Sequence, residues 1–248
     1  MAATPLCEAP IAALKKSLRD EFPHVKSSHL SEALARSLGF RTYASMQIAL
    51  AGLEQDRPFA LLNTEHFVER LVQLGYDQDS EFDFELIVLF RPVGGVVSTK
   101  PLSAYEIEYK TIRQKAWRNL MVSAINAGIK QKLFTLRCGD NRFIDDMYGG
   151  QLFDFLLPNG MAARGAVSDA GFDELSVSAA VNPKGDRVRS HNAGFEAGDA
   201  VGTTWVERAR GAWIQSSDSL FSCRRPLLAV LAGFQVEPQG YGDRGGIM

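Results

Sequence analysis

The chain has 248 residues, which is enough for one large domain or two smaller ones and enough to bury a core without metal or disulfide staples. Apolar residues make up 46% and charged residues 23%, the proportions of a folded globular protein, which excludes a disordered chain. The formal charge of −2 argues against general polyanion binding, so the local distribution of charge matters more than the total.

Three cysteines, Cys7, Cys138 and Cys223, are far apart in the sequence. Their odd number, and the lack of a C-x-x-C pair or a neighbouring histidine, predict neither a disulfide framework nor a zinc site. The N-terminal run MAATPLCEAPIAALKK lacks the basic start and long apolar core of a secretory signal, and no segment has the length and apolarity of a membrane span. We therefore expect a cytoplasmic protein that starts at residue 1 and does not associate with a membrane.

Four helices are predicted at the N-terminus. Their apolar residues recur every three or four positions, and Ser28 and Thr42 are suitable N-caps. Pro23, Gly39 and Gly75 are suitable stops. The expected ranges are residues 8–20, 28–38, 42–53 and 64–74, with a linker near 55–58.

The periodicity then changes. Residues Phe82 to Phe90 alternate apolar with acidic side chains, which predicts a half-buried strand and a domain boundary near residue 78. A second alternation at Tyr105 to Tyr109 leads into helical spacing that ends at Gly128. The residues with this spacing are Ile112, Ala116, Leu120 and Ala124.

Short strands separated by turn signals are expected next, at residues 132–138, 151–157, 161–167 and 174–181. The four-residue spacing of Trp205, Ala209 and Trp213 predicts a helix over 203–215. Residues 227–236 are apolar but fit either a strand or a helix, and the glycine-rich end suggests a frayed tail. The predicted class is α+β, with a helical unit at 1–77, an antiparallel-sheet domain covered by helices at 78–238, and a flexible tail at 239–248.

The stretch Ser27 to Leu50 is similar to a DNA-binding helix-turn-helix. The residues that fall where that family places them are Leu34, Ala35, Leu38, Gly39 and Phe40. The second helix offers only Thr42, Ser45 and Gln47 to base edges, without Arg, Lys or Asn, so base reading is poorly supported. Contacts to the phosphate backbone are expected from nearby cations: Lys15, Lys16, Arg19, Lys26 and Arg41.

The run S-H-x-x-E-A-L-A-x-x-L-G-F-x-T-Y-A-x-M-Q, from Ser28 to Gln47, also resembles a short helical module. That module recurs at the ends of proteins carried on plasmids and integrative elements, including some helicases and proteins of the glyoxalase superfamily. The resemblance covers about the first fifty-five residues and implies a mobile-element context more than an activity. Residues 78–248 lack the paired βαβββ pattern with His and Glu ligands, so glyoxalase chemistry is not carried over.

Charge is segregated along the chain. Residues 54–91 carry nine acidic side chains against three arginines, whereas residues 110–142 carry eight basic ones against Asp140. The basic block, represented by Lys110, Arg113, Lys115, Arg118, Lys130 and Lys132, is a candidate phosphate-binding surface. Tyr105, Tyr109 and Trp117 would stack on bases if exposed, but they fit equally a solvated helix packed on a sheet. A third reading is that the acidic and basic segments face each other.

One enzymatic reading is a Mg²⁺-dependent nuclease of the restriction-endonuclease-like type. It would use Glu69 on a helix, Asp83 at a strand end, and Glu108 and Lys110 as an E-x-K on the next strand. An E-x-K triplet is common by chance, and Asp83 faces outward in its alternation.

Other candidates are weaker. Asp145, Asp146 and Asp154 lie in or near a turn-like segment where exposed carboxylates are ordinary, and His191 has no nucleophile at motif spacing. No Walker or dinucleotide glycine loop is present, so no cofactor is expected.

The preferred hypothesis is a non-catalytic accessory protein of a mobile element that binds nucleic acid or a nucleoprotein complex. The alternatives are a protein-interaction module, acting as an inhibitor or adaptor on a charged partner, and the nuclease.

Overall fold

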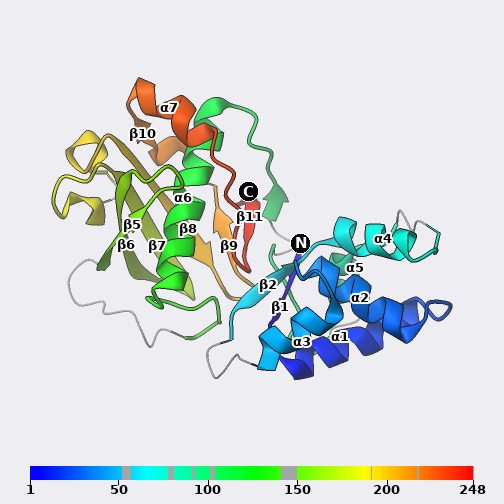
Figure 1. Ribbon diagram of the computed structural model, residues 1–248. Coiled ribbons are helices and arrows are strands. Elements are labelled where there is room, and N and C mark those ends of the chain that lie inside the picture. Colours follow the sequence, from blue (N-terminus) through cyan, green and yellow to red (C-terminus); the bar gives the residue numbers. More distant parts are fainter. Residues whose placement is uncertain are drawn as a thin grey trace. The chain divides into compact units, whose positions relative to one another are not determined.

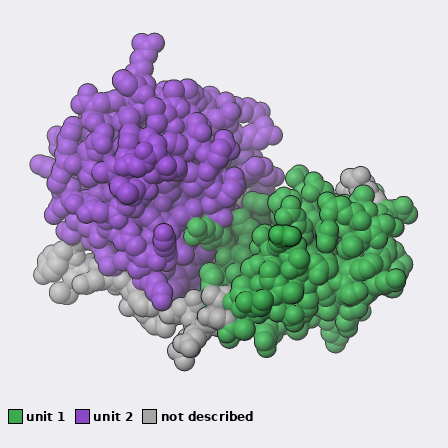
Figure 2. Space-filling model, in the orientation of Figure 1, with its two compact units in different colours: residues 1–99, 239–241 green, residues 100–238, 242–248 purple. Residues whose placement is uncertain are grey.

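The computed structural model describes residues 1–51, 57–77, 81–90, 93–100, 104–140, 150–190, 192–216 and 218–247. The chain divides into two compact units (Figure 2). Unit 1 comprises residues 1–99 and 239–241, and unit 2 comprises residues 100–238 and 242–248. Helices and mainly antiparallel sheets make up the fold, so the expected α+β class is confirmed (Figure 1).

Unit 1 contains five helices within its described residues. They are α1 (Glu8–Glu21), α2 (Ser27–Ser37), α3 (Tyr43–Ala51), α4 (Thr64–Gln73) and α5 (Phe84–Phe90). The first four occupy the predicted ranges, because their apolar residues line one face and that face is buried. Leu14 of α1, Leu34 of α2, Met46 of α3 and Phe67 of α4 are fully buried in one core.

A small sheet completes unit 1 and was not predicted. Its order is β2-β1-β3, with β1 (Ala2–Pro5) antiparallel to both β2 (Phe59–Leu62) and β3 (Val97–Ser98). Strands of two to four residues are too short to show an alternation that sequence reading can detect.

The predicted strand at Phe82–Phe90 is wrong, because this segment forms α5. Asp83 Oδ1 accepts the backbone N–H of Glu85 at 3.0 Å, so the acidic residue that suggested alternation lies at the start of a helix. Phe84 and Ile87, three residues apart, are both buried in the core of unit 1. Helical spacing therefore buries both side chains on one face.

The boundary expected near residue 78 falls instead between Thr99 and Lys100. The reason is that α5 and β3 complete the helical unit. Val96 belongs to the same core as α5, and the backbone N–H of Thr99 donates to the carbonyl of Met1 at 2.8 Å.

Unit 2 is built on a sheet of order β4-β11-β9-β8-β7-β6-β5, with β10 paired to β8. The strands are β4 (Ala104–Glu106), β5 (Gln151–Leu156), β6 (Ala162–Gly171), β7 (Glu174–Val181), β8 (Ala200–Glu207), β9 (Trp213–Gln215), β10 (Ser222–Cys223) and β11 (Gly242–Ile247). Strands β5, β6 and β7 match predicted ones, whereas residues 132–138 form turns and not the expected strand. Three short 3₁₀ helices, η1 (Arg187–Arg189), η2 (Gly194–Glu196) and η3 (Asp218–Leu220), lie in the connections.

Helix α6 (Ile112–Lys130) lies across β6, β7 and β8 and confirms the predicted long helix (Figure 1). It begins with a capping box, in which Thr111 Oγ1 accepts from the N–H of Gln114 and the Gln114 side chain accepts from the N–H of Thr111. Helix α7 (Arg225–Ala232) packs against α6. The apolar segment at 227–236, which fits either a strand or a helix by sequence, is therefore helical up to Ala232.

The helix predicted at 203–215 is wrong, because these residues form strands β8 and β9. Glu207 pairs with Trp213 and Trp205 pairs with Gln215 in antiparallel register. The four-residue spacing of Trp205, Ala209 and Trp213 is typical of a helix, but here it is produced by a strand, a turn and a returning strand.

The tail expected to fray instead forms β11, between β4 and β9 in the sheet. Its glycines are needed for packing. A Cβ on Gly245 would lie 2.2 Å from the Trp213 ring, and one on Gly246 would lie 2.7 Å from the Tyr105 ring. The composition that indicated flexibility thus permits two aromatic rings to lie against the strand.

Candidate nucleic-acid interface

The predicted helix-turn-helix segment forms two helices joined by a tight turn. Gly39 follows α2 with φ of +83°, a value that favours glycine. The N–H of Phe40 donates to the carbonyl of Ala35 at 2.9 Å and that of Gly39 to Arg36 at 3.1 Å, the two hydrogen bonds of a Schellman motif. The turn is therefore specified locally by the Leu-Gly-Phe sequence.

Two of the three residues offered for base reading have structural roles. Thr42 Oγ1 accepts the N–H of Ser45 at 3.1 Å, and Ser45 Oγ accepts the N–H of Thr42 at 3.2 Å. This reciprocal pair caps the start of α3. Gln47 remains exposed and not used in the cap.

The outer face of α3 is mostly apolar. Ala44, Ile48 and Ala51 are exposed along it, and the side chain of Ile48 is 77% exposed. These three side chains have no hydrogen-bond donor for a base edge, and Gln47 is the exposed polar side chain beside them.

A groove of about 390 Å³ lies between α1 and α3, and four of the predicted nucleic-acid-binding residues line it. Lys15, Lys16 and Arg19 come from α1, and Gln47 comes from α3. The remaining lining residues are Glu8, Ile11, Ala12, Tyr43 and Leu50. Among the described residues, three cations and one carboxylate thus share a single groove, which we name the basic groove.

Contacts to neighbouring side chains position two of the cations in the basic groove. Lys15 Nζ lies 5.3 Å from the centre of the Tyr43 ring, a cation–π distance. Partial burial, together with repulsion from the Arg19 guanidinium, lowers the pKa of Lys15. Arg19 Nε donates to Ser27 Oγ at 3.1 Å, which fixes the guanidinium beside the start of α2. The contacts that position the positively charged side chains of Lys15 and Arg19 are therefore made to neutral groups.

Tyr43 lies in the third predicted helix, and no pattern assigned it to a binding surface. The structure places it half-buried on the wall of the basic groove. Its pairing with Lys15 joins residues 28 positions apart on different helices, so no local pattern indicates it.

Lys26 and Arg41 are exposed but do not line the basic groove. The backbone N–H of Lys26 donates to the hydroxyl of Tyr76 at 3.1 Å. Both side chains flank α2 and stay candidates for additional phosphate contacts.

The basic block of α6 is partly used inside unit 2. Arg118 forms an ion pair with Asp243 of β11, with Nη2 to Oδ2 at 2.6 Å and Nε to Oδ2 at 2.7 Å. Both side chains are nearly buried, 15% and 5% exposed. Arg118 also donates to the carbonyl of Val236, so its predicted role as an open cation is not supported.

Arg113 also makes contacts within unit 2. Its guanidinium donates to the carbonyls of Asp218 and Phe221 and lies 5.4 Å from the centre of the Phe221 ring. These bonds hold the connection that contains η3 against the start of α6. Both hydrogen bonds come from Nη2 and go to backbone carbonyls, so these contacts do not neutralise the charge of Arg113.

The four lysines of the block, Lys110, Lys115, Lys130 and Lys132, are exposed. Lys110 Nζ lies 3.3 Å from Glu108 Oε2 in a surface ion pair, a type worth little in water. They are spread from the segment before α6 to the turn after it and share no described groove.

The aromatic residues proposed for stacking pack inside unit 2, apart from Tyr105. Trp117 is fully buried and its Nε1 donates to the carbonyl of Thr203 at 3.1 Å. Tyr109 lies 6.1 Å from Trp117, ring centre to ring centre, and its hydroxyl donates to the carbonyl of Asp243. Burial raises the pKa of Tyr109. The alternative of packing on the sheet is therefore correct for Tyr109 and Trp117.

The arrangement required by the nuclease reading is absent from the described residues. Asp83 begins a helix instead of ending a strand, and Glu108 and Lys110 follow β4 and pair with each other. Glu69 is an exposed residue of α4. Throughout the described ranges, no three His, Cys, Asp or Glu side chains gather in a way that would hold a metal ion.

Of the other acidic candidates and the histidine, only Asp154 lies within the described residues. Asp145, Asp146 and His191 lie outside the described residues. Asp154 accepts from Arg164 Nε at 2.7 Å and from Nη2 at 3.1 Å, and this pairing lowers the pKa of Asp154. It is a cross-strand pair between β5 and β6.

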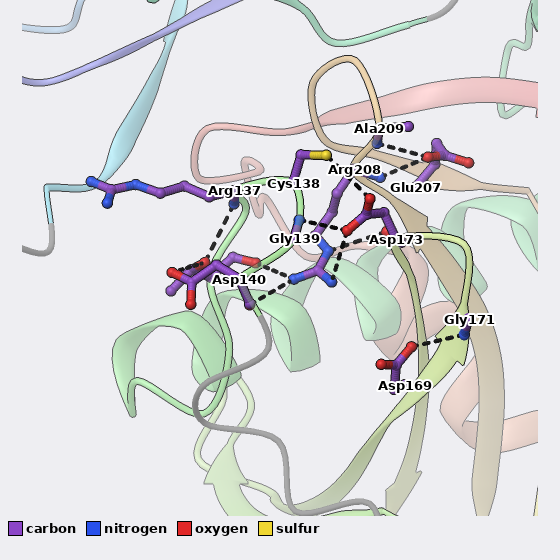
Figure 3. Close-up of polar contacts among 11 residues, drawn as sticks. Arg137, Cys138, Gly139, Asp140, Asp169, Gly171, Asp173, Glu207, Arg208 and Ala209 are labelled. Atoms are coloured by element: carbon purple, nitrogen blue, oxygen red, sulfur yellow. Dashed lines mark hydrogen bonds and ion pairs between the residues drawn. The ribbon is translucent and has the colours of Figure 1, made fainter.

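A buried arginine that no sequence pattern indicated lies directly after β8 (Figure 3). Arg208 donates to the carbonyls of Thr135 at 3.0 Å and of Asp140 and Asp173 at 3.2 Å. The Asp173 carboxylate lies 3.9 Å from Arg208 and also accepts the N–H of Gly139. These contacts tie the turn after α6 to the β6–β7 hairpin, so the arginine has a structural role.

No protein-family model, curated protein or solved structure matches this chain. Among the described helices, none is long and apolar enough to cross a membrane.

Proposed function

We propose that the chain is a non-catalytic accessory protein of a mobile genetic element that binds nucleic acid, alone or in a nucleoprotein complex, through the basic groove. The observation that carries the proposal is that Lys15, Lys16 and Arg19 line one groove, where Glu8 is the carboxylate among the described lining residues. The mobile-element context rests on the resemblance of the segment from Ser28 to Gln47.

Electrostatics favour a polyanion in this groove. The pKa of Lys15 is lowered by partial burial first and then by repulsion from the Arg19 guanidinium, so like charges act on each other in this groove. A phosphate between these side chains would replace repulsion with attraction. Lysine and arginine are the side chains that proteins use for phosphate contacts.

The groove is suited to the backbone of a nucleic acid more than to its bases. Thr42 caps α3, and the outward side chains of that helix are Ala44, Ile48 and Ala51. Gln47 is the one amide among the described lining residues of the groove. Contacts to phosphates position a protein without reading sequence, so attachment independent of sequence is expected.

Contacts within unit 2 also reduce the number of open cations on the second predicted surface, the basic block of residues 110–142. Arg118 is paired with Asp243, and Arg113 is bonded to backbone carbonyls. Lys115, Lys130 and Lys132 are left as exposed cations that contribute general attraction.

The test is a salt titration of binding to labelled duplex DNA, single-stranded DNA and RNA. Three phosphate contacts to duplex DNA give a slope of about −2.7 in log K against log salt, or about a 40-fold loss of affinity between 50 and 200 mM salt. The triple variant Lys15→Gln, Lys16→Gln, Arg19→Gln is expected to bring this slope close to zero.

A matched triple variant, Lys115→Gln, Lys130→Gln, Lys132→Gln, removes the same charge from exposed positions of unit 2. It is expected to retain most of the slope. Equal losses in the two triple variants would show that only net charge matters, and a wild-type affinity indifferent to salt would contradict the proposal outright.

A further inference from the structure

Two glutamates lie opposite each other at one end of the unit 2 sheet. Glu174 begins β7 and Glu207 ends β8, and the two are directly paired in the antiparallel register. Side chains of directly paired residues point to the same face of a sheet, so like charges at such positions repel each other. Both side chains are half-buried, where water screens this repulsion less than it does on an open surface.

Hydrogen bonds hold both carboxyl groups in place. Oε1 of Glu207 accepts the backbone N–H of Arg208 at 3.0 Å and that of Ala209 at 2.8 Å (Figure 3). Two N–H donors favour a carboxylate, so the negative charge belongs on Glu207. Oε1 of Glu174 accepts from Nε2 of Gln215 in β9 at 2.9 Å. The pair therefore links the side chains of three neighbouring strands, β7, β8 and β9.

The charge that acts on Glu174 among the described residues is that of Glu207. Figure 3 shows the guanidinium of Arg208 directed away from the Glu207 carboxylate and toward the carbonyls that it binds. The Asp173 carboxylate accepts from Cys138 Sγ and from the N–H of Gly139. The other titratable groups on the adjacent segments are Asp169 in β6, Arg137 and Asp140 in the turn after α6, and Arg210 in the turn after β8.

Two facing carboxyl groups without a cation between them favour the state in which one of them is protonated. Partial burial first, and then the negative charge of Glu207 and a hydrogen bond with its side chain, raise the pKa of Glu174. The hydrogen bond from Gln215 opposes this rise. The two groups therefore titrate as a pair, and the proton lies on Glu174.

We propose that Glu174 and Glu207 share one proton and form a pH-sensitive clamp across β7, β8 and β9. In the closed clamp, the protonated carboxyl of Glu174 donates to the Glu207 carboxylate and still accepts from Gln215. Loss of the proton leaves two facing carboxylates, which weakens this end of the sheet. The inference goes beyond nucleic-acid binding, since it concerns residues of unit 2 alone.

The clamp stabilises the folded chain in acid. The pKa of Glu174 is higher in the folded chain than in the unfolded one, so protonation favours the folded state. This contribution is fully present below the unfolded value, about 4.3, and is lost as pH rises through the folded value. Asp154 has the opposite dependence, because Arg164 lowers its pKa. The clamp is therefore measured as a difference between matched variants at each pH.

The first test is urea denaturation of the full-length wild type and Glu174→Gln, followed by tryptophan fluorescence, from about pH 4.5 to about pH 8. Trp213 is paired with Glu207 and Trp205 with Gln215, so the signal reports this end of the sheet. Glutamine is neutral at every pH, can donate to Glu207 and can accept from Gln215. The two proteins should have equal unfolding constants at the acid end. At the alkaline end, the wild-type constant should be about threefold or more higher than that of Glu174→Gln.

A matched control is Glu106→Gln, which removes an exposed carboxylate from β4 of the same sheet. Its unfolding constant should follow that of the wild type at every pH.

The second test follows the side-chain carboxyl carbons by nuclear magnetic resonance as pH is raised. The Glu174 signal, assigned as the one missing in Glu174→Gln, should titrate at higher pH than that of Glu106. In Glu207→Gln it should move toward the Glu106 curve, because the charge opposite Glu174 is gone. The glutamine carbonyl can still accept the two N–H groups that hold position 207.

Any of three outcomes would overturn the proposal. The first is a Glu174 carboxyl that titrates together with Glu106. The second is a Glu174 titration that Glu207→Gln leaves unchanged, which would assign the effect to burial alone. The third is a difference in unfolding constant between wild type and Glu174→Gln that is the same at every pH, or that Glu106→Gln reproduces.

Discussion

Replacing Arg118 with Met distinguishes a structural cation from a nucleic-acid-binding one. The change leaves the Asp243 carboxylate without its partner at a site where that side chain is only 5% exposed. Removing one member of a buried ion pair costs about 3–5 kcal/mol, because the remaining charge is not solvated. At about 2–4 °C per kcal/mol for a unit of this size, the melting temperature should fall by about 10 °C.

The assay is thermal unfolding followed by tryptophan fluorescence. All three tryptophans, Trp117, Trp205 and Trp213, belong to unit 2, so this signal reports that unit alone. Asp243→Asn should cost about 1.5–3 kcal/mol, the value of a hydrogen bond to a charged group. The double variant should be more stable than the sum of the single effects predicts, with a coupling of about 1–3 kcal/mol.

The salt dependence of nucleic-acid binding should not change in folded Arg118→Met, because this guanidinium already faces Asp243 and Val236. Single effects below about 0.5 kcal/mol with additive behaviour would refute the ion pair as a structural element. A flatter slope of log K against log salt in Arg118→Met, at unchanged stability, would also refute it. That result would identify Arg118 as a nucleic-acid-binding cation.

Three further predictions concern unit 2. Ending the chain after Tyr241 removes β11 from between β4 and β9, so the cooperative tryptophan transition should be lost; an unchanged transition would mean that this segment is a dispensable tail. Phe172 is 98% exposed at the tip of the β6–β7 hairpin with φ of +53°, so Phe172→Asn should raise the free energy of unfolding by about 0.5–1 kcal/mol in urea denaturation, and a loss would contradict the turn geometry. Burial raises the pKa of the Cys223 thiol from 9.0 to about 11, so alkylation at pH 8, measured by mass spectrometry, should be about a hundredfold slower in the native protein than in denaturant. Because the folded pKa is the higher one, this thiol's contribution to stability is present below pH 9 and is lost as pH rises from about 9 to 11.

Apolar residues spaced three or four positions apart predict the helices correctly where those residues pack into a core. The helices α1 to α4 follow the spacing of leucine, methionine and phenylalanine, and α6 follows a similar pattern behind Thr111. The spacing of apolar residues predicts the wrong element at α5 and at the β8–β9 hairpin. There, seven to thirteen residues fit both a two-residue and a four-residue period, and contacts with distant segments selected one of them.

The candidate site was predictable in part. The local composition of α1 identified Lys15, Lys16 and Arg19 as a basic stripe, and the structure places all three in one groove. Composition also marked Arg118 as a cation of the same kind. Its pairing with Asp243, 125 positions later in the sequence, is a contact that no local pattern contains.

The sequence by itself determined the α+β class, the helix-turn-helix segment and the segregation of charge, because each follows from residues within a few positions of one another. The tertiary structure alone decided which charges stay open. Burial and ion pairing depend on which distant segment lies opposite, as Asp243 does for Arg118 and as Tyr43 does for Lys15. It also decided that the glycine-rich end is a strand, since the need for glycine there comes from the rings of Trp213 and Tyr105.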